Sequence, residues 1–180
     1  GIENPIHDES EALAELEQAL SKSVQQQSLA DVPLGAFLSG GVDSSLIVAL
    51  MQKQSMQPVK SFTIGFEDPA FDESGYAKAV AQHLGTEHQT LMATSADAQA
   101  VIPKLGCMYD EPFADSSQIP TYMVCQAARQ HVTVALSGDA GDELFGGYNR
   151  YFWGPKIWDK ISWMPFPARR AAGLFIQSSR

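Results

Sequence analysis

The chain has 180 residues, enough for one hydrophobic core, and its 44% apolar and 18% charged residues are typical of a globular rather than a disordered protein. Its formal net charge is −9, and no cluster of Lys and Arg interrupts that balance, which disfavours a nucleic-acid partner bound through phosphate contacts. No apolar run reaches the length of a membrane span, so we expect no membrane partner.

Hydrophobic periodicity predicts strands that alternate with helices. Apolar residues recur at steps of three and four in the helices, and short β-branched runs mark the strands. The predicted helices cover residues 8–27, 44–54, 72–84, 95–105 and 119–130, with another beginning within 142–148, and the predicted strands cover 34–38, 59–66, 87–92 and 132–136. This alternation indicates an α/β fold with three layers, α/β/α, in which the middle layer is a twisted parallel sheet.

Residues 1–150 are expected to form one domain that includes the N-terminal helix. From residue 151 onward, aromatic residues and prolines crowd a short span, and we expect the start of a helical part whose apolar faces pack on a partner segment. The chain ends there without a helix stop signal, so it is expected to be a fragment of a longer protein.

The compartment is expected to be the cytoplasm. Cys107 and Cys125 have no CxxC partner, which disfavours a zinc site and favours core or half-buried thiols in a reducing environment. The first eight residues lack the basic and apolar regions of a secretory signal.

The segment Ser39-Gly40-Gly41-Val42-Asp43-Ser44-Ser45 follows the first predicted strand, where ligands bind in open parallel sheets. Its glycines allow the backbone to approach a ligand, and successive amides at a helix N-terminus attract an anion. The serine hydroxyls add donors. A plainer interpretation is a glycine-rich turn in which Asp43 or Ser44 is the N-cap of the next helix.

The segment lacks the lysine of a Walker A loop. A bare carboxylate at Asp43 would repel phosphate, so its expected role is to hold Mg²⁺ that bridges phosphate oxygens. A second glycine- and carboxylate-rich turn, 137–148, follows the strand at 132–136. Because both turns follow strands of one sheet, Asp142 and Asp43 could share one metal ion.

Three motifs together resemble a known family. S-G-G-V-D-S-S resembles the signature of the PP-loop ATP pyrophosphatases, and S-G-D-A-G-D-E-L-F-G-G-Y with D-E-P-F-A-D-S-S-Q-I-P-T-Y is similar to the synthetase domain of glutamine-dependent asparagine synthetases. The resemblance covers residues 31–151. It implies a Rossmann-like fold of the adenine nucleotide α hydrolase type, with ATP and Mg²⁺ as cofactors.

The resemblance also implies roles for individual residues. The ATP-binding set is Leu38, Ser39, Gly40, Gly41, Asp43, Ser44, Ser45, Ile64, Ser137 and Gly138, in which Leu38 and Ile64 offer main-chain contacts to adenine. Asp43 and Asp142 would hold Mg²⁺ and, with Glu143, form the catalytic set. Glu143 and Asp139 either meet the amino-acid substrate or order the turn. Asp110, Glu111 and Asp115 either line the aspartate pocket or cap a loop, and the second interpretation is favoured.

The implied reaction is amidation of aspartate through a β-aspartyl-adenylate, with release of AMP and pyrophosphate. Ammonia would come from a glutaminase domain with an N-terminal cysteine, which is expected to be absent because the chain begins at Gly1. A homodimer is possible. Two alternatives remain open: the same chemistry on another carboxylate, such as a sugar acid or a β-lactam precursor, and a catalytically inactive ATP-binding fragment.

Overall fold

The computed structural model describes residues 5–69, 72–111 and 114–178, and the side chains of Ala172 and Ser178 are not described. The chain forms two compact units, Gly1–Gly138 and Asp139–Arg180. The domain boundary expected at residue 150 lies inside the second unit and stays a prediction.

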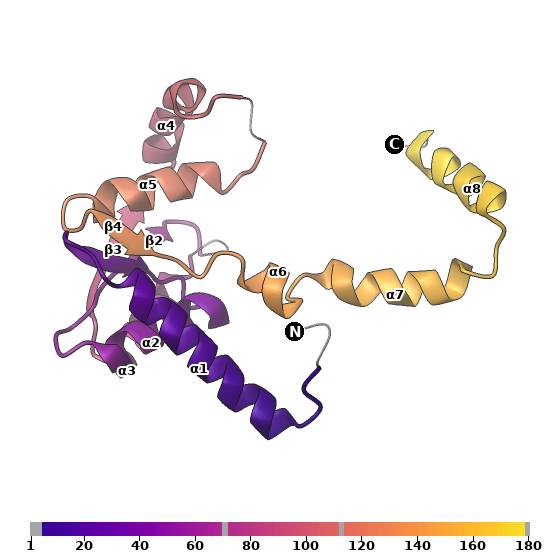
Figure 1. Cartoon of the computed structure of the whole chain (residues 1–180). Helices are drawn as coiled ribbons and strands as arrows, with labels where there is room; N and C mark the ends of the chain where they lie inside the picture. Colours follow the sequence, from indigo (N-terminus) through magenta and orange to yellow (C-terminus); the bar gives the residue numbers. More distant parts are fainter. Residues whose placement is uncertain (1–4, 70–71, 112–113, 179–180) are drawn as a thin grey trace. The chain divides into compact units, whose positions relative to one another are not determined.

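The first unit is a four-stranded parallel sheet with the order β3-β2-β1-β4, covered by helices (Figure 1). Its elements in chain order are α1 (Glu9–Gln27), β1 (Leu34–Phe37), α2 (Val42–Gln54), β2 (Lys60–Phe66), α3 (Ser74–Leu84), β3 (Glu87–Ala93), α4 (Ser95–Met108), α5 (Gln118–Ala128) and β4 (Val134–Leu136). The predicted α/β fold with a parallel sheet is confirmed.

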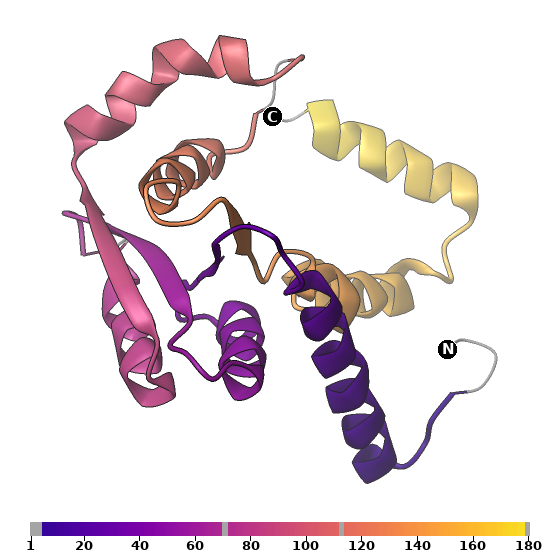
Figure 2. The ribbon, with the colours of Figure 1, turned by 60° about the vertical axis from the view of Figure 1, so that its left-hand side comes forward.

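The side chains of β1 explain why helices cover both faces of the sheet. Successive residues of a strand point to opposite faces. Ala36 is fully buried in a cluster with residues of α1, α2 and α3, whereas Phe37 packs with α5 residues and Phe62. A further cluster joins β2 and β3 to α4 and α5. The layers are therefore α1, α2 and α3 on one face and α4 and α5 on the other (Figures 1 and 2).

Local hydrogen bonds explain where several elements begin and end. The Asp8 side chain accepts a hydrogen bond of 2.8 Å from the Glu11 amide, so Asp8 is the N-cap of α1. The predicted strand at 132–136 is too long, because the Val132 amide donates to the Ala128 carbonyl at the end of α5 and the Thr133 amide donates to the Pro33 carbonyl. Only Val134–Leu136 pairs with β1.

The second unit consists of α6 (Gly141–Phe145), α7 (Asn149–Ile161) and α8 (Phe166–Ser178). The helix predicted to begin within 142–148 begins at Gly141 and ends at Phe145, where Gly146 adopts a left-handed conformation with φ 71°. No α7 residue is buried, and Trp153, Trp158 and Trp163 are exposed. These faces are free for the packing that the sequence predicts. Among the helices of the described ranges, none is both long and apolar enough to cross a membrane.

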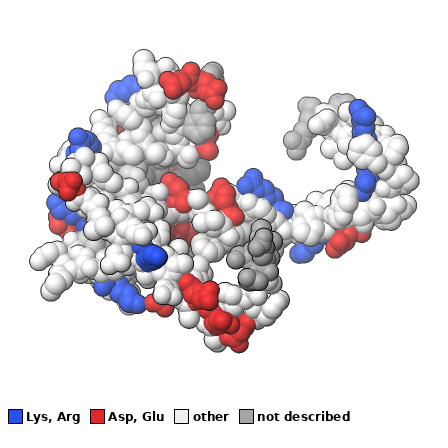
Figure 3. Space-filling model, viewed as in Figure 1, with Lys and Arg blue, Asp and Glu red and all other residues white. Residues whose placement is uncertain are grey.

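Both cysteines are unpaired and exposed, so the expectation of core or half-buried thiols is wrong. Cys107 lies in α4 and Cys125 in α5, on helix surfaces that face away from the sheet clusters. Basic side chains lie apart from one another on the face drawn in Figure 3 and form no stripe there, whereas acidic side chains gather at the N-terminal end of α1.

Candidate active site

The loop from 38 to 41 joins the carboxyl end of β1 to the N-terminus of α2. Gly41 is the N-cap, with extended backbone and no side-chain cap hydrogen bond, and its carbonyl accepts the Ser45 amide at 3.1 Å. Asp43 and Ser44 therefore lie inside the first helical turn, and the interpretation that one of them is the N-cap is wrong. The helix begins two or three residues earlier than that interpretation requires.

Two serine side chains fix the shape of this loop. The Ser39 amide donates to Ser44 Oγ at 3.2 Å, the two hydroxyls lie 2.9 Å apart, and Ser44 Oγ donates to the Gly41 carbonyl at 3.3 Å. The Gly41 amide in turn donates to Ser39 Oγ at 3.3 Å. Both hydroxyls are thus engaged within the loop, which holds it in one conformation before any ligand arrives.

The first turn of α2 presents main-chain donors. The amides of Val42, Asp43 and Ser44 precede the first carbonyl-to-amide bond of the helix, so they have no partner within it. The helix macrodipole adds partial positive charge at the same place. With no side-chain cap on Gly41, this helix end is suited to bind an anion.

Gly40 allows α3 to approach the loop. Its φ is +84°, and a Cβ at this position would lie 2.7 Å from both the Ala77 amide nitrogen and Tyr76 Cβ. Any other residue would meet both a strained backbone conformation and the first turn of α3. The close approach fixes the loop against α3.

Gly138 brings the end of β4 onto the same helix end. A Cβ on Gly138 would lie 2.6 Å from the Ser44 amide nitrogen and 2.8 Å from the Asp43 carbonyl carbon. Ser137 directly follows β4, which pairs with β1 through Ala36 and Leu136. The structure thus brings Ser137 and Gly138, two of the expected nucleotide-binding residues, next to the first turn of α2.

Ser45 differs from its neighbours in the loop. Its Oγ is buried and has no hydrogen-bond partner. The residue lines a cavity of about 490 Å³ with Ala79, Val80 and His83 of α3. Its hydroxyl therefore faces α3, whereas Ser44 faces Ser39, and its expected contact with a phosphate stays a prediction.

Ile64 and Leu38 lie at the carboxyl ends of neighbouring strands. The Leu38 amide donates to the Phe62 carbonyl at 2.9 Å, which leaves only its carbonyl for a ligand. Main-chain groups alternate along a strand, so those of Ile64 point to the same side as those of Phe62, toward β1. Because β1 ends at Phe37, the main chain of Ile64 lies beyond the last residue of its neighbouring strand.

The carboxylates expected to act with the loop lie in the second unit, around the short helix α6. The Tyr148 hydroxyl donates to Glu143 Oε1 at 2.8 Å. This hydrogen bond holds the pKa of Glu143 below its ordinary value, to which the positive charge of Arg150 also contributes. The same hydrogen bond raises the pKa of Tyr148, and the charge of Arg150 opposes that rise. A Cβ at Gly147 would overlap Asp142 Oδ1, so the Asp142 carboxylate lies directly over the Gly147 backbone.

Asp43 belongs to the first unit and Asp142 to the second, and their joint ligation of one metal ion stays a prediction. Within the described ranges, no group of three or more His, Cys, Asp or Glu side chains gathers as a metal site. Each of the two carboxylates is by itself an oxygen donor of the kind that Mg²⁺ binds, and Mg²⁺ usually completes its shell with water and phosphate oxygens.

Asp115 holds the turn before α5, in line with the favoured interpretation for that residue, whereas the roles of Asp110 and Glu111 stay predictions. Asp115 Oδ1 accepts the Ser117 amide at 2.8 Å. Hydrogen bonds from the side chain and then the amide of Ser117 hold the pKa of Asp115 below its ordinary value. Ser117 occupies the N-cap position but its own side chain makes no cap hydrogen bond. Pro112 and Phe113 of the same motif lie outside the described residues.

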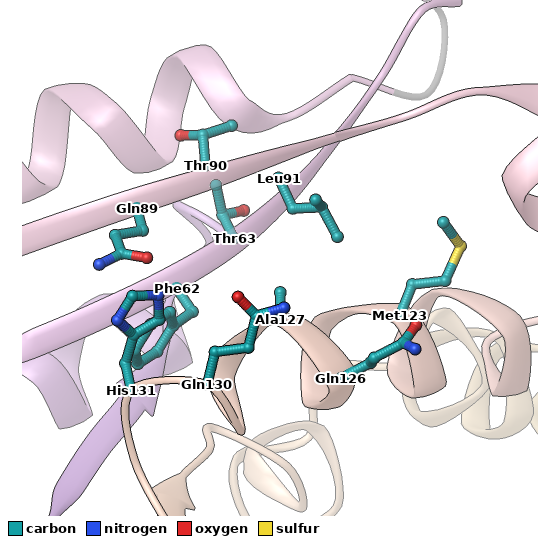
Figure 4. Close-up of a pocket in the computed structure, with 10 residues that line it drawn as sticks. All are labelled: Phe62, Thr63, Gln89, Thr90, Leu91, Met123, Gln126, Ala127, Gln130 and His131. Atoms are coloured by element: carbon teal, nitrogen blue, oxygen red, sulfur yellow. The ribbon is translucent and has the colours of Figure 1, made fainter.

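A second cavity, of about 220 Å³, lies between the sheet and α5 (Figure 4). Sequence reasoning did not predict it, because its lining comes from scattered positions: Phe62, Thr63, Gln89, Thr90, Leu91, Met123, Gln126, Ala127, Gln130 and His131. The His131 ring stacks on Phe62 with centroids 5.9 Å apart. No Lys or Arg lines this cavity, which makes it poorly suited to the phosphates of a nucleotide.

The parallel sheet, with an uncapped helix N-terminus at the end of a central strand, defines an open α/β protein of the kind that binds ligands beyond the carboxyl ends of its strands. Solved structures support this fold: an NH3-dependent NAD synthetase from Campylobacter jejuni has a TM-score of 0.51 at 13% identity, covering 77% of this chain and 62% of that one. An NMN synthetase from Francisella tularensis has a TM-score of 0.53 at 16% identity, covering 77% of this chain and 59% of that one.

The chain belongs to the asparagine synthase family, whose sequence model matches residues 15–179. It is 43% identical over 145 residues to a putative asparagine synthetase [glutamine-hydrolyzing] 2 of Methanocaldococcus jannaschii, covering 80% of this chain and 28% of that protein. It is 43% identical over 148 residues to asparagine synthetase [glutamine-hydrolyzing] 1 of Bacillus subtilis, covering 82% of this chain and 23% of that protein. The chain thus spans about a quarter of the length of these relatives.

Proposed function

We propose that this chain is the ATP-binding part of an enzyme that amidates aspartate to asparagine and cleaves ATP to AMP and pyrophosphate. The observation that carries the proposal is the open N-terminus of α2, held rigid by Ser39 and Ser44 and packed against Gly138. Membership of the asparagine synthase family and the names of the relatives support the choice of reaction.

The first turn of α2 holds the β- and γ-phosphates in this proposal. Amides of Val42, Asp43 and Ser44 point out of the helix end, and Gly40 and Gly41 leave room for phosphate oxygens close to the backbone. The Ser45 hydroxyl, buried without a partner, gains an acceptor when its side chain rotates from α3 toward the pyrophosphate. Ser137 and Gly138 line the side of the site nearest the α-phosphate.

Adenine binds at the carboxyl ends of β1 and β2. The main-chain N–H and C=O of Ile64 offer a donor and an acceptor side by side, which matches the edge of an adenine ring. The Leu38 carbonyl is the second main-chain contact, because its amide is engaged with Phe62.

Asp43 and Asp142 would hold Mg²⁺ in this proposal, and the metal would supply positive charge that offsets the negative charge of pyrophosphate. Asp43 lies at the helix end that binds the phosphates. Asp142 lies in α6, a few residues after the end of β4 in the sequence. Glu143 contributes to the site through the turn that it holds.

The chemistry needs no nucleophile from the protein. A side-chain carboxylate oxygen of aspartate attacks the α-phosphorus, and the bond to the bridging oxygen breaks with its electron pair going to pyrophosphate. Ammonia then attacks the acyl carbon, AMP leaves, and one proton passes to solvent. The helix amides accelerate the first step because they are already oriented toward the charge that develops on pyrophosphate.

The ammonia comes from glutamine in a glutaminase domain outside this chain, as the names of the relatives suggest. We place the protein in the cytoplasm, where ATP and aspartate are available and the exposed thiols stay reduced. A homodimer is the assembly we propose, and light scattering on the complete protein at several concentrations tests it.

Amide and AMP formation by the complete protein tests the proposed function. Aspartate with ATP, Mg²⁺ and ammonia is expected to give asparagine and AMP in equal amounts, whereas a sugar acid gives neither. Activity with the sugar acid alone would keep the chemistry but overturn the substrate. The isolated 180-residue chain is expected to bind ATP weakly and to have little synthetase activity.

A further inference from the structure

The turn that carries Asp142 is built on a helix too short to be stable alone. Helix α6 has five residues and lies between two left-handed residues, Ala140 with φ 70° and Gly146 with φ 71°. Isolated helices of this length do not persist in water. Contacts from outside α6 must therefore hold its side chains in place.

Tyr148 provides such a contact. It is the N-cap residue of α7, and its hydroxyl reaches back across Gly146 and Gly147 to donate to Glu143 at 2.8 Å. The hydrogen bond joins the start of one helix to the preceding one. Because the acceptor is a carboxylate, the bond belongs to the stronger, charge-assisted kind.

Arg150 supports the pair from the other side. Its guanidinium lies 4.3 Å from the centroid of the Tyr148 ring and 5.4 Å from that of Tyr151. Tyr148 and Tyr151 themselves lie 6.0 Å apart between ring centroids. The Tyr148 ring thus lies against both Arg150 and Tyr151 while its hydroxyl donates to Glu143.

Asp142 is adjacent to Glu143 and shares the constraint. The Gly147 amide donates to the Asp142 carbonyl at 3.0 Å, and the Asp142 carboxylate lies over Gly147. Fixing Glu143 to Tyr148 therefore fixes the peptide on which the Asp142 carboxylate is mounted. If Glu143 instead recognised the amino-acid substrate, its carboxylate would have to be free of the hydrogen bond to Tyr148.

We propose that Tyr148, Glu143 and Arg150 form a clamp, and that Tyr148 and Glu143 are positioning residues that orient Asp142 for Mg²⁺ and the nucleotide. The inference rests on the proposed function of Asp142. In this view Glu143 acts through its hydrogen bond and does not contact aspartate.

The test compares Tyr148→Phe, Glu143→Ala and Glu143→Gln in the complete protein, with Tyr151→Phe as the matched control. Tyr148→Phe and Glu143→Ala are each expected to lower the rate of AMP formation about tenfold and to raise the Mg²⁺ concentration at half-maximal rate, with the KM for aspartate nearly unchanged. Glu143→Gln recovers most of that loss, because its amide oxygen still accepts from Tyr148. The double variant with Tyr148→Phe and Glu143→Ala is expected to form AMP no more slowly than either single variant.

A Glu143→Gln variant as impaired as Glu143→Ala would overturn the proposal, because it would mean that the charge itself contacts substrate or metal. Amide hydrogen exchange over residues 141–150 provides a readout that does not depend on activity. Exchange is expected to be faster in Tyr148→Phe than in the wild type and in Tyr151→Phe, and equal rates would contradict the clamp. If the wild type forms no AMP, the proposed function fails while exchange still decides the clamp.

Discussion

Gly138 and Ser44 are in such close contact that a single methyl group would not fit between them. A Cβ at Gly138 would lie 2.6 Å from the Ser44 amide nitrogen. The contact joins the turn after β4 to the first turn of α2. These two segments are far apart in the sequence, because β2 and β3 and their helices lie between them. It makes the proposed pyrophosphate site a composite of two strand ends.

Gly138→Ala should therefore damage the site. The neighbours are backbone atoms of a helix end and cannot rotate away, so the expected loss of folding free energy is about 1–3 kcal/mol, with weaker ATP binding. Gly106→Ala is the control: Gly106 is inside α4 with nothing near a built Cβ, and alanine should stabilise the helix by about 0.5–1 kcal/mol. Urea unfolding and ATP titration measure both. Equal behaviour of the two variants would contradict the packing.

Ser44 and Ser45 should respond in opposite ways to alanine. Ser44→Ala removes the acceptor of the Ser39 amide and is expected to cost about 1–3 kcal/mol. Ser45→Ala removes a buried hydroxyl without a partner, so the free energy of unfolding should stay equal or rise slightly. ATP affinity should fall in both variants if Ser45 reaches the phosphates. Denaturant unfolding and ATP titration of both variants provide the comparison.

Much of the fold was predictable because the periodicity of the first unit is strong. The limits of β4 were not, since they depend on where the amides of Val132 and Thr133 find acceptors: one at the end of α5 and one at Pro33. Such partners are distant in sequence, and residue pattern carries no information about them.

The candidate site was likewise predictable only in part. The chemistry of the loop followed from its glycines and serines, but the directions of Ser44 and Ser45 depend on α2 beginning after Gly41. The pairing of Tyr148 with Glu143 had no sequence signature either. The two residues are five apart, and they meet only because Gly146 turns the chain back.

His88 makes stability depend on pH. Its Nδ1 lies 2.9 Å from Ser61 Oγ beneath α3, and burial, with the nearby positive charge of Lys78, holds the pKa of His88 below its ordinary value. As the pH falls below about 6.5, His88 takes up a proton in the unfolded chain before it does so in the folded chain. The free energy of unfolding therefore decreases from that pH down to the lower pKa that His88 has in the folded state. His88→Gln should lose less stability than the wild type between pH 7.5 and 5.5. Denaturant unfolding of both proteins at both pH values measures this difference. Equal losses of unfolding free energy in the wild type and in His88→Gln would contradict the role of His88.

Asp43→Asn keeps the size of the side chain and removes its charge. The complete enzyme should then need more Mg²⁺ and form AMP at least about tenfold more slowly, because one carboxylate ligand is lost. Asp159→Asn on the exposed surface of α7 is the control and should leave both values unchanged. Rates measured across a Mg²⁺ series distinguish the two variants. A normal Mg²⁺ requirement in Asp43→Asn would remove Asp43 from the metal site.

The bond at which ATP is cleaved tests the central claim most directly. The complete protein, given aspartate, ammonia, Mg²⁺ and ATP labelled in the α-phosphate, is expected to yield labelled AMP and unlabelled pyrophosphate in step with asparagine. Labelled ADP with inorganic phosphate would show cleavage at the γ-phosphate and contradict the role assigned to the α2 N-terminus.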